Sequence, residues 1–441
     1  MIFIMRHFFQ KMKTEQLYSI FKKSRGVSTD SRTIKKGEMF FALWGNNYNG
    51  NLYADEALEK GACCAVIDDP MYEREKTMLV DDCLFELQAL ATFHRRELKV
   101  PVLAITGSNG KTTTKELIAS ILSRKMKVHY TKGNLNNHIG VPVTILSAPP
   151  DVELMIIEMG ANHIGEIRTL CLIARPDYGI VTNIGTAHIE GFGSFEGVIK
   201  AKTELFEYLR KVNGIAIYND KNPLLSEKIF RIVNRAVPYT DPNGTELRVE
   251  VTASDLMLTI SAEYQHQNYP INTNLFGKYN LENLKAAIAT SLFLGSDMPD
   301  IVKAIEKYVP GNNRSEVKVT ENNTIICDSY NANPESMRNA IEAFMETSAR
   351  KKLMILGDML ELGGRTQEEH LGLLKELNNQ GLDNVLLVGP VFKSLSEGFG
   401  LKSFSSVDDL MEYLESNPIK GNHILVKGSH GIMLEKIYDL L

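Results

Sequence analysis

One short run of residues constrains the fold of this chain more than any other. Residues 106–114 read TGSNGKTTT, and they follow an apolar stretch at 102–105 and precede a helix-like stretch from 116 to 122. A strand, a glycine-rich turn and a helix start in this order form a phosphate-binding loop, because the N–H groups of the turn and the positive end of the helix dipole converge on phosphate oxygens. The sequence therefore predicts an α/β fold that binds a nucleotide.

The residues that would bind phosphate lie inside this loop. The glycines let the backbone approach the phosphate, Lys111 adds a full positive charge, and the hydroxyl group of a following threonine can hold Mg²⁺. The spacing is the short G-x-x-G-K-T form, since Ile105 stands where the common pattern has a glycine. A turn that only joined a strand to a helix would not need Lys-Thr at the helix start, so ATP or GTP is the expected ligand. The expected contacts are Gly107, Asn109, Gly110, Lys111, Thr112 and Thr113.

Composition narrows the class of protein. The chain has 441 residues, 44% of them apolar and 23% charged, as expected for a soluble globular protein of about three domains. The formal net charge of -5 gives no general attraction to nucleic acid or to an anionic membrane, so a small-molecule partner is expected. The five cysteines show no metal-binding spacing, and no apolar stretch reaches the ~18 residues of a membrane span. We therefore expect a cytoplasmic protein with reduced thiols. We also expect a monomer, which the composition itself does not determine.

Three segments of the chain differ in pattern, and together they predict an α/β fold of three domains. Residues 1–98 combine turn-rich polar stretches with short apolar runs, which predicts a small α/β domain. From 99 to 312, apolar strands alternate with amphipathic helices, which predicts a mainly parallel sheet with an antiparallel addition between about 245 and 275. Residues 313–441 repeat the alternation and predict a Rossmann-like domain. Its first strand is not followed by the full G-x-G-x-x-G fingerprint, so no dinucleotide cofactor is indicated.

Three side chains are candidates for chemistry on residue pattern alone. Glu158 follows the apolar strand at 154–157, at the edge where open α/β sheets bind ligands, so a Mg²⁺ ligand is favoured over a surface carboxylate. His188 follows the strand at 179–181 and could hold a metal or stabilise phosphate charge, with a packed histidine as the alternative. Lys202 lies on a helix-like stretch, where the pattern favours a solvated lysine.

Five motifs, in a fixed order, resemble those of the Mur ligases, which are ATP-dependent amide-forming enzymes of peptidoglycan precursor synthesis. They are the loop at 106–114, GNLNNHIGVP at 133–142, EMG at 158–160, NIGTAHIE at 183–190 and KAKTELF at 200–206. The resemblance extends over almost the entire chain. It implies that the three domains bind a UDP-sugar, ATP and the incoming amine substrate, in that order.

The same resemblance implies a catalytic set. Lys111 matches the phosphate-binding lysine, Thr112 and Glu158 match ligands of a first Mg²⁺, and His188 matches a ligand of a second. Lys202 matches a lysine that reacts with CO₂. The resulting carbamate has carboxylate-like oxygens, which suit Mg²⁺ or the γ-phosphate.

Four further positions match nucleotide contacts of the family. Asn280 and Asn283 match the adenine-side motif, where an amide can pair a donor and an acceptor with the base edge. Arg314 matches the phosphate-binding arginine at the entry to the third domain, and Asp328 matches a ribose contact.

Two C-terminal motifs resemble the branch of the family that adds D-alanyl-D-alanine to UDP-N-acetylmuramoyl-tripeptide. They read DSYNANPESM at 328–337 and LGDMLELG at 356–363. The resemblance implies that Tyr330, Asn331 and Asn333 face the dipeptide, with an Asx-rich turn that caps the following helix as the alternative. On the side of the UDP-tripeptide, the implied contacts are Ser31, Arg32, Asn136 and Asn137.

Four positions depart from the family pattern. Tyr279 stands where histidine is usual, and Asn51 stands where a histidine usually follows the N-terminal glycine turn. Asn313 replaces a glycine, and His430 replaces an arginine. These changes affect the adenine contacts and the last loop, but they remove no expected metal or phosphate ligand.

The reaction implied by the resemblance is ATP-dependent amide-bond formation through an acyl phosphate, with closure of the C-terminal domain when ATP binds. The alternatives are the sibling ligase that adds the third residue, a folylpolyglutamate synthetase and a P-loop regulatory NTPase. The UDP-domain signature at 28–32 disfavours the folate enzyme, YNANP at 330–334 disfavours the sibling, and the NTPase would need a motif such as N-K-x-D, which is absent. The third residue of the tripeptide, meso-diaminopimelate or L-lysine, stays open.

Overall fold

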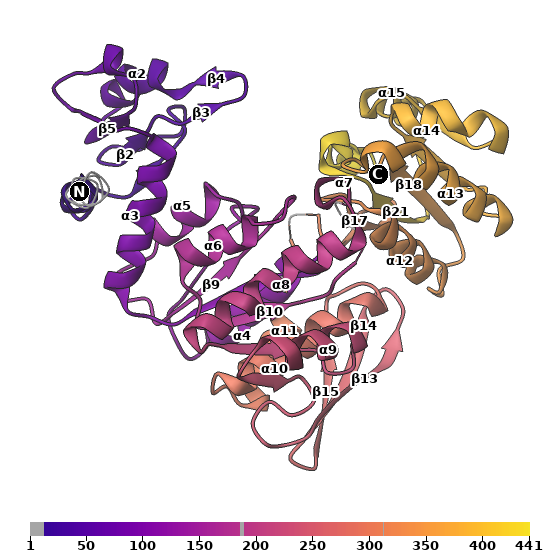
Figure 1. Ribbon diagram of the computed structural model, residues 1–441. Helices are drawn as coiled ribbons and strands as arrows, with labels where there is room; N and C mark the ends of the chain where they lie inside the picture. Colours follow the sequence, from indigo (N-terminus) through magenta and orange to yellow (C-terminus); the bar gives the residue numbers. More distant parts are fainter. Residues whose placement is uncertain (1–12, 186–188, 312) are drawn as a thin grey trace.

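The computed structural model describes residues 13–185, 189–311 and 313–441. Figure 1 shows three lobes, with the N-terminal lobe (indigo) and the C-terminal lobe (orange to yellow) on opposite sides of the central lobe. Each lobe contains its own β-sheet. The predicted three-domain α/β fold is therefore confirmed, whereas the boundaries 1–98, 99–312 and 313–441 remain predictions.

A four-stranded parallel sheet in the order β1-β2-β5-β6 forms the N-terminal lobe. Its long helix α3 begins after Asp82, whose side chain caps the helix by accepting a hydrogen bond from Phe85 N. Helix α3 packs on α5 and α6 of the central lobe, so one hydrophobic core continues from the first lobe into the second. The elements are β1 (Val27–Ser28), β2 (Met39–Phe41), β3 (Trp44–Gly45), β4 (Tyr48–Asn49), α2 (Ala54–Glu59), β5 (Cys64–Ile67), β6 (Thr77–Leu79), α3 (Cys83–Leu98), α5 (Gly140–Leu146) and α6 (Glu166–Ala174).

The central lobe is built on a six-stranded parallel sheet in the order β12-β11-β10-β7-β9-β8. Successive side chains of a strand point to opposite faces, and Val102 and Ala104 of β7 join the core on one face while Leu103 and Ile105 join the core on the other. Burial on both faces explains the continuous apolar run of this strand. The elements are β7 (Val102–Thr106), α4 (Lys111–Leu122), β8 (Val128–Tyr130), β9 (Leu154–Glu158), β10 (Tyr178–Val181), α7 (Ile189–Phe192), α8 (Phe195–Val212), β11 (Ile215–Tyr218), α9 (Pro223–Ile232) and β12 (Ala236–Pro238).

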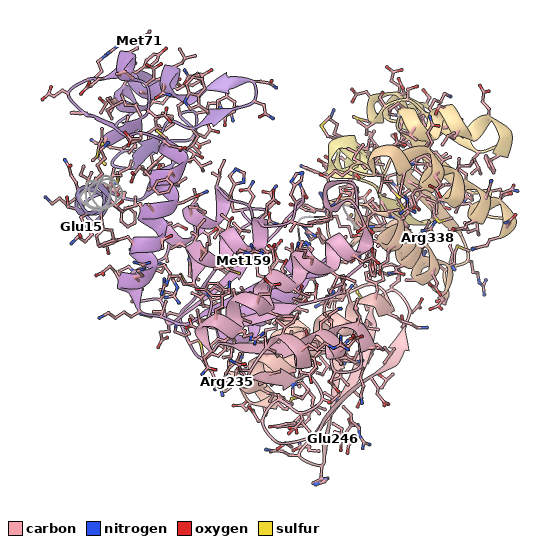
Figure 2. The ribbon with its side chains drawn as sticks, viewed as in Figure 1. Glu15, Met71, Met159, Arg235, Glu246 and Arg338 are labelled. Carbon is pink, nitrogen blue, oxygen red and sulfur yellow. The ribbon has the colours of Figure 1, made fainter. Side chains whose placement is uncertain are left out.

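A three-stranded antiparallel sheet and two helices complete the central lobe. The strands are β13 (Leu247–Ser254), β14 (Leu258–Tyr264) and β15 (Gln267–Asn272), and they confirm the antiparallel addition predicted between about 245 and 275. Helices α10 (Leu281–Phe293) and α11 (Met298–Lys307) pack against α4. Figure 2 places the exposed side chains of Arg235 and Glu246 on the side of this lobe that faces away from the other two lobes.

The C-terminal lobe contains a six-stranded sheet in the order β16-β17-β21-β18-β19-β20, parallel except for the antiparallel edge strand β16. Phe276 of the central lobe is fully buried in the core of this lobe, which links the two. The elements are β16 (Glu316–Val319), β17 (Thr324–Asp328), α12 (Pro334–Met345), β18 (Lys352–Gly357), α13 (Thr366–Asn379), β19 (Val385–Val388), α14 (Pro390–Leu395), β20 (Lys402–Phe404), α15 (Val407–Ser416) and β21 (His423–Lys427).

The carboxyl ends of β7, β9 and β10 meet at one edge of the central sheet. In the register of this sheet, Ile105 lies opposite Glu158 and Thr106 lies opposite Val181. The phosphate-binding loop follows β7 at this edge. Glu158 and the segment after Val181 therefore flank the loop, at the position where open α/β sheets bind ligands.

Two expectations drawn from composition concern the state of the cysteines and the absence of a membrane span. The five cysteines are free thiols, and only Cys63 is exposed. Burial raises the pKa of the Cys64 thiol to about 11, with a smaller contribution from Cys63. Within the described ranges, no helix is both long enough and apolar enough to cross a membrane.

Candidate active site

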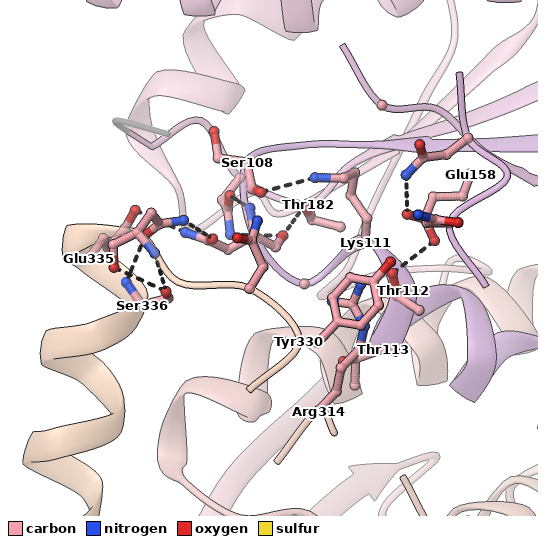
Figure 3. Close-up of a pocket in the computed structure, with 18 of the residues that line it drawn as sticks. Ser108, Lys111, Thr112, Thr113, Glu158, Thr182, Arg314, Tyr330, Glu335 and Ser336 are labelled. Carbon is pink, nitrogen blue, oxygen red and sulfur yellow. Dashed lines mark hydrogen bonds between the residues drawn. The ribbon is translucent and has the colours of Figure 1, made fainter. Parts of the chain in front are cut away.

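A cavity of about 1700 Å³ lies between the central and C-terminal lobes. Its walls include the phosphate-binding loop, the ends of β9 and β10, helix α8, and the loops that follow β17 and β21. A site for one small ligand usually has a volume of roughly 300–1,000 Å³. The cavity therefore has room for more than one substrate, and Figure 3 shows some of the side chains that line it.

Two glycines allow the phosphate-binding loop to take its shape. Gly107 has a φ of +146° and Gly110 a φ of +78°, values that side chains rarely permit. A Cβ atom at Gly107 would lie 2.0 Å from Thr182 Oγ1, and a Cβ atom at Gly110 would lie 2.2 Å from Asn283 Oδ1. The loop is thus enclosed between the segment after β10 and helix α10, with no room for a side chain at either glycine.

The segment after β10 holds the loop in place by hydrogen bonds. Asn109 N donates to Asn183 Oδ1 at 2.9 Å, and Thr182 Oγ1 donates to Asn109 O at 2.6 Å. Gly185 N donates to Ser108 Oγ at 2.9 Å. The loop is therefore fixed at the start of α4, where the helix dipole favours an anion.

Lys111 begins α4 and reaches back over the loop (Figure 3). Its Nζ donates to Gly107 O at 2.7 Å and to Ser108 O at 3.0 Å. Burial lowers the pKa of Lys111 to about 8; the charge of Glu158 opposes this shift and that of Arg314 adds to it. A phosphate group beside the ammonium group would offset the effect of burial, so Lys111 is suited to bind one.

Thr112 and Glu158 form a pair of oxygen ligands beside the loop. Thr112 Oγ1 donates to Glu158 Oε2 at 2.9 Å, and Asn136 Nδ2 donates to Glu158 Oε1 at 2.9 Å (Figure 3). Hydroxyl and carboxylate oxygens next to a phosphate site are the ligands that Mg²⁺ prefers, so these residues fit one ion. No group of three or more His, Cys, Asp or Glu side chains that could hold a metal occurs in the described part of the chain.

Glu158 is almost fully buried, yet its surroundings favour the ionised form. Burial on its own raises the pKa of this carboxyl group, but the charges of Lys115, Lys111 and Arg314 and the hydrogen bond from Asn136 outweigh it and lower the pKa below its usual value. The sequence predicted this carboxylate at the end of a buried strand, and the structure places it there, next to the loop.

Lys202 lies on α8 in the wall of the cavity. The residue is only 2% exposed, and its Nζ lies 5.3 Å from the centre of the Phe192 ring. The expectation of a solvated lysine, drawn from the helix pattern alone, is therefore wrong for Lys202, whereas Lys200 on the same helix is exposed. The helix presents Lys202, and not Lys200, to the cavity.

Burial also changes the chemistry of Lys202. It lowers the pKa of this amine to about 7, helped by the charge of Lys111 and opposed by the charges of Glu166 and Glu204. A large part of the amine is therefore uncharged at neutral pH, as a nucleophile must be. His188, the expected ligand of a second Mg²⁺, lies outside the described residues.

Asn280 and Asn283 lie together in another wall of the cavity. Asn283 Nδ2 donates to Asn280 Oδ1 at 2.8 Å, and Asn280 Nδ2 donates to Phe276 O at 2.8 Å. Thr114 Oγ1 donates to Asn283 Oδ1 at 3.2 Å. Much of the hydrogen-bonding capacity of the two amides is thus used to hold each other, and their contact with adenine remains a prediction.

Arg314, Tyr330 and His430 form a stack on the C-terminal side of the cavity. The Cζ atom of Arg314 lies 3.6 Å from the centre of the Tyr330 ring, and the rings of Tyr330 and His430 stack with their centres 5.8 Å apart. The Nε atom of Arg314 is buried and has no hydrogen-bond partner among the described residues. A buried donor of this kind is costly unless a ligand accepts from it. Arg314 therefore fits the predicted role of a phosphate ligand.

Asp328 ends β17 and is held by two neighbours. Its Oδ2 accepts from Lys427 Nζ at 2.7 Å, and its Oδ1 accepts from Ser315 N at 3.2 Å. The Lys427 side chain is almost fully buried and also donates to Asn331 O at 3.3 Å. Lys427 was not among the residues predicted from the sequence. The available signal was its position at the end of the apolar strand β21, whose neighbour in the sheet is β17.

Asn109 joins the phosphate-binding loop to the C-terminal lobe. Asn333 Nδ2 donates to Asn109 Oδ1 at 2.8 Å, and Asn109 Nδ2 donates to Glu335 Oε2 at 3.0 Å (Figure 3). Asn333 also caps α12 by accepting from Ser336 N at 2.9 Å, so the alternative prediction of a helix cap is confirmed for this residue. The contact partners Asn109 and Asn333 lie 224 positions apart in the chain, and no local pattern in the sequence indicates that they meet.

Three other asparagine and tyrosine positions expected near the substrates also line the cavity: Asn137, Tyr330 and Asn331. Asn137 Oδ1 accepts from Gly140 N at 2.8 Å at the start of α5, and Asn331 Oδ1 accepts from Ala332 N at 2.9 Å. Both amides thus shape their own loops, and neither NH₂ group has a hydrogen-bond partner among the described residues, so a substrate could use both.

Ser31 and Arg32 lie in the N-terminal lobe and do not line this cavity. Ser31 Oγ donates to Glu56 Oε2 at 3.3 Å, and Arg32 forms an ion pair with Asp30 at 2.7 Å. The structure therefore brings the phosphate, metal and C-terminal residues together but keeps the two residues expected to bind UDP apart from them.

Comparison with known proteins gives matches along most of the chain. The model of the Mur ligase family catalytic domain matches residues 23–92, that of the Mur ligase middle domain matches 105–291, and that of the Mur ligase glutamate ligase domain matches 313–430. The UDP-N-acetylmuramoyl-tripeptide--D-alanyl-D-alanine ligase of Bacillus subtilis (strain 168) is 35% identical, over 93% of this chain and 92% of the relative.

Solved structures also match this chain over most of its length. A crystal structure of MurF from Acinetobacter baumannii has a TM-score of 0.81 and 30% identity, over 94% of this chain and 92% of its own. A crystal structure of the MurF ligase from Thermotoga maritima in complex with ADP has a TM-score of 0.82 and 26% identity, over 96% of this chain and 97% of its own.

Proposed function

The chain belongs to the Mur ligase family, and on this basis we propose that it joins D-alanyl-D-alanine to UDP-N-acetylmuramoyl-tripeptide in an ATP-dependent reaction. The relatives that carry this activity in their names match more than nine-tenths of the chain. The sibling that adds the third residue, the folate enzyme and the regulatory NTPase are therefore set aside. The proposed product is the pentapeptide precursor of peptidoglycan, with ADP and phosphate released.

One observation supports the chemistry most directly: two cationic side chains line the site where a phosphate would bind. Lys111 lies over the loop, and Arg314 lines the same cavity with a buried Nε donor that has no partner among the described residues. A substrate carboxylate must approach the γ-phosphate of ATP, and two anions about 4 Å apart repel strongly in a site that excludes water. These side chains would reduce that repulsion and stabilise the charge of the transferring phosphoryl group.

The reaction then follows in two steps. The carboxylate of the tripeptide attacks the γ-phosphorus, and the bond to ADP breaks, which gives an acyl phosphate. The amine of D-alanyl-D-alanine attacks the acyl carbon, loses a proton, and expels phosphate as the amide bond forms. The cavity is lined both by the loop and by Tyr330 and Asn331 of the C-terminal lobe, so the nucleotide and the dipeptide can bind next to each other in one site, and closure of that lobe would keep water away from the acyl phosphate.

Magnesium belongs to this proposal. Thr112 and Glu158 would hold one ion, and His188 and Lys202 would hold a second. When bound, Mg²⁺ neutralises phosphate charge and orients the phosphoryl group. Asn136 would keep the Glu158 carboxylate in place through its hydrogen bond at 2.9 Å.

We also propose that Lys202 carries a carbamate. Its uncharged amine would add to CO₂ with loss of one proton, which replaces a cation by an anionic oxygen ligand. The buried position in the cavity wall and the pKa of about 7 support this reaction. We expect a carbamate signal in the ¹³C NMR spectrum of protein equilibrated with ¹³CO₂ at pH 8, weaker at pH 6, because protonation below the pKa removes the nucleophile.

The matched controls for this prediction lie on one helix. Lys202→Met should lose the signal and most of the activity, whereas Lys200→Met, at an exposed position of α8, should keep both. A wild-type protein that shows no carbamate signal, or one that Lys202→Met retains, would refute the modification.

The substrate assignment is tested by ADP release with a panel of substrates. ADP should form rapidly only when UDP-tripeptide and D-alanyl-D-alanine are both present, and tripeptides ending in meso-diaminopimelate and in L-lysine should be compared. Turnover with L-lysine or diaminopimelate as the amine, and UDP-dipeptide as the acceptor, would instead assign the sibling activity. ADP release without any carboxylate substrate would favour the regulatory NTPase.

We propose further that the enzyme acts in the cytoplasm as a monomer.

A further inference from the structure

Lys115 is a buried lysine to which the reaction above gives no role. It lies on α4, one helical turn after Lys111 and three residues after Thr112. Residues four apart on a helix share a face, but the two side chains differ in direction: Lys111 Nζ turns back to Gly107 O and Ser108 O, whereas Lys115 Nζ lies beside Glu158. The Lys115 side chain has no exposed surface.

Two carboxylates lie close to this ammonium group. The Nζ of Lys115 is 3.3 Å from Glu158 Oε2 and 3.8 Å from Glu116 Oε1. Among the described residues Nζ makes no hydrogen bond, so both contacts are ion pairs and not hydrogen bonds. Glu158 is the nearer of the two carboxylates, and Glu116 also accepts a hydrogen bond from Tyr308 OH at 2.8 Å.

The Glu158 carboxylate is held on every side. Its Oε2 faces both Thr112 Oγ1 and Lys115 Nζ, and its Oε1 accepts from Asn136 Nδ2. The backbone of the same residue is fixed, because Glu158 N donates to Thr131 Oγ1 at 3.0 Å. Lys115 therefore approaches the same oxygen that Thr112 contacts, from the protein interior.

A purely structural lysine would be an unfavourable choice at this position. Burial of an ammonium group is costly unless ion pairs and hydrogen bonds compensate it, and an apolar side chain of the same volume is often as stable. Lys115 has the ion pair but, within the described part of the chain, lacks the hydrogen bonds. The charge itself is thus the property that this position provides.

We propose that Lys115 is a positioning residue for the magnesium site: its ammonium group fixes the Glu158 carboxylate beside the Thr112 hydroxyl, so that the oxygen pair is formed before the metal binds. The inference rests on the proposed function, because it concerns the ion that accompanies ATP. Lys115 contacts neither the nucleotide nor the metal in this role; it acts through Glu158.

The test measures metal binding rather than turnover. Full-length protein is loaded with ADP, and Mn²⁺ is added as the probe, with free Mn²⁺ read from its EPR signal. Lys115→Met, which keeps the length and removes the charge, should raise the half-saturating Mn²⁺ concentration by about tenfold or more, the effect usual for residues that orient a metal ligand. Lys115→Arg should recover most of the affinity. If Lys115→Met does not fold, Lys115→Gln takes its place.

Glu116→Gln is the matched control, because it removes the other carboxylate near Lys115 without touching the metal site. It should leave Mn²⁺ affinity unchanged. A Lys115→Met protein that is less stable but binds Mn²⁺ as tightly as the wild type, or more tightly, would overturn the inference and leave Lys115 as an ordinary ion-pair partner. A wild-type ADP complex that binds no Mn²⁺ would instead refute the proposed magnesium site, so the two failures can be told apart.

Discussion

Replacement of Lys111 by methionine should lower the rate of ADP formation by about 10³-fold, the loss typical for one charge-stabilising group in a preorganised site. Lys111 Nζ lies over the loop, where its hydrogen bonds among the described residues go to the carbonyl groups of Gly107 and Ser108. A phosphate bound in the loop would therefore lose the full charge nearest to it. The measurement is ADP release at saturating ATP, UDP-tripeptide and D-alanyl-D-alanine.

A lysine on the protein surface, just after the helix that Lys111 begins, serves as the control. Lys125 lies just beyond the end of α4 and pairs with Asp297 at 2.6 Å on the surface. Lys125→Met should keep the wild-type rate to within about twofold, because an exposed ion pair contributes little. The melting temperature of Lys111→Met must stay close to that of the wild type, since otherwise a loss of rate would report unfolding. A folded Lys111→Met protein with an undiminished rate would contradict the role of this loop.

The second large effect should come from Gly107→Ala. The new Cβ would lie 2.0 Å from Thr182 Oγ1, and the residue would have to keep a φ of +146°. Backbone strain of this kind costs about 1–3 kcal/mol, which corresponds to roughly a fivefold to 150-fold loss of nucleotide affinity if the loop must keep its shape to bind. Calorimetric titration with ADP measures this directly.

Gly244→Ala is the control that separates a change in the shape of the phosphate-binding loop from the general effect of backbone strain. Gly244 also has a positive φ, +71°, but no atom of the described residues lies within 4 Å of its added Cβ. This variant should lose some stability and keep its affinity for ADP. Equal affinities for ADP in Gly107→Ala and in the wild type would show that the loop is not shaped by this glycine.

The sequence predicted the regions where a local pattern decides the structure. Strands β7, β9 and β10 are continuous apolar runs because both faces of the central sheet are covered, and the glycine turn after β7 needs backbone angles that only glycine adopts freely. Parallel strands align their carboxyl ends at one edge, so the strand pattern alone was enough to place Glu158 near the loop.

Contacts between distant segments could not be predicted in the same way. The pairing of Asn109 with Asn333 and Glu335 depends on how two lobes pack, which no short stretch of sequence encodes. The burial of Lys202 and Lys115 depends in turn on how elements of the central lobe pack around them. A lysine on an amphipathic helix is usually solvated, and only the position of the neighbouring elements shows that these two are not.

Two of the positions that depart from the family pattern have clear structural roles. The Asn51 side chain is fully buried and pairs with Asp68 in both directions, donating to its Oδ1 at 2.8 Å and accepting from its backbone N at 3.1 Å. The hydroxyl group of Tyr279 forms a hydrogen bond of 2.9 Å with Oγ of Ser315, the residue that follows Arg314 in the chain. These residues therefore stabilise the N-terminal lobe and the junction with the C-terminal lobe.

One isotope experiment tests the central claim, that the phosphate-binding loop activates a carboxyl group for amide synthesis. Both oxygens of the UDP-tripeptide carboxyl group that receives the dipeptide are labelled with ¹⁸O, and the phosphate released during turnover is measured by mass spectrometry. Formation of an acyl phosphate predicts one ¹⁸O atom in each phosphate, because the second step breaks the bond between the acyl carbon and that oxygen. Phosphate without the label, produced while the amide bond forms at the normal rate, would contradict it.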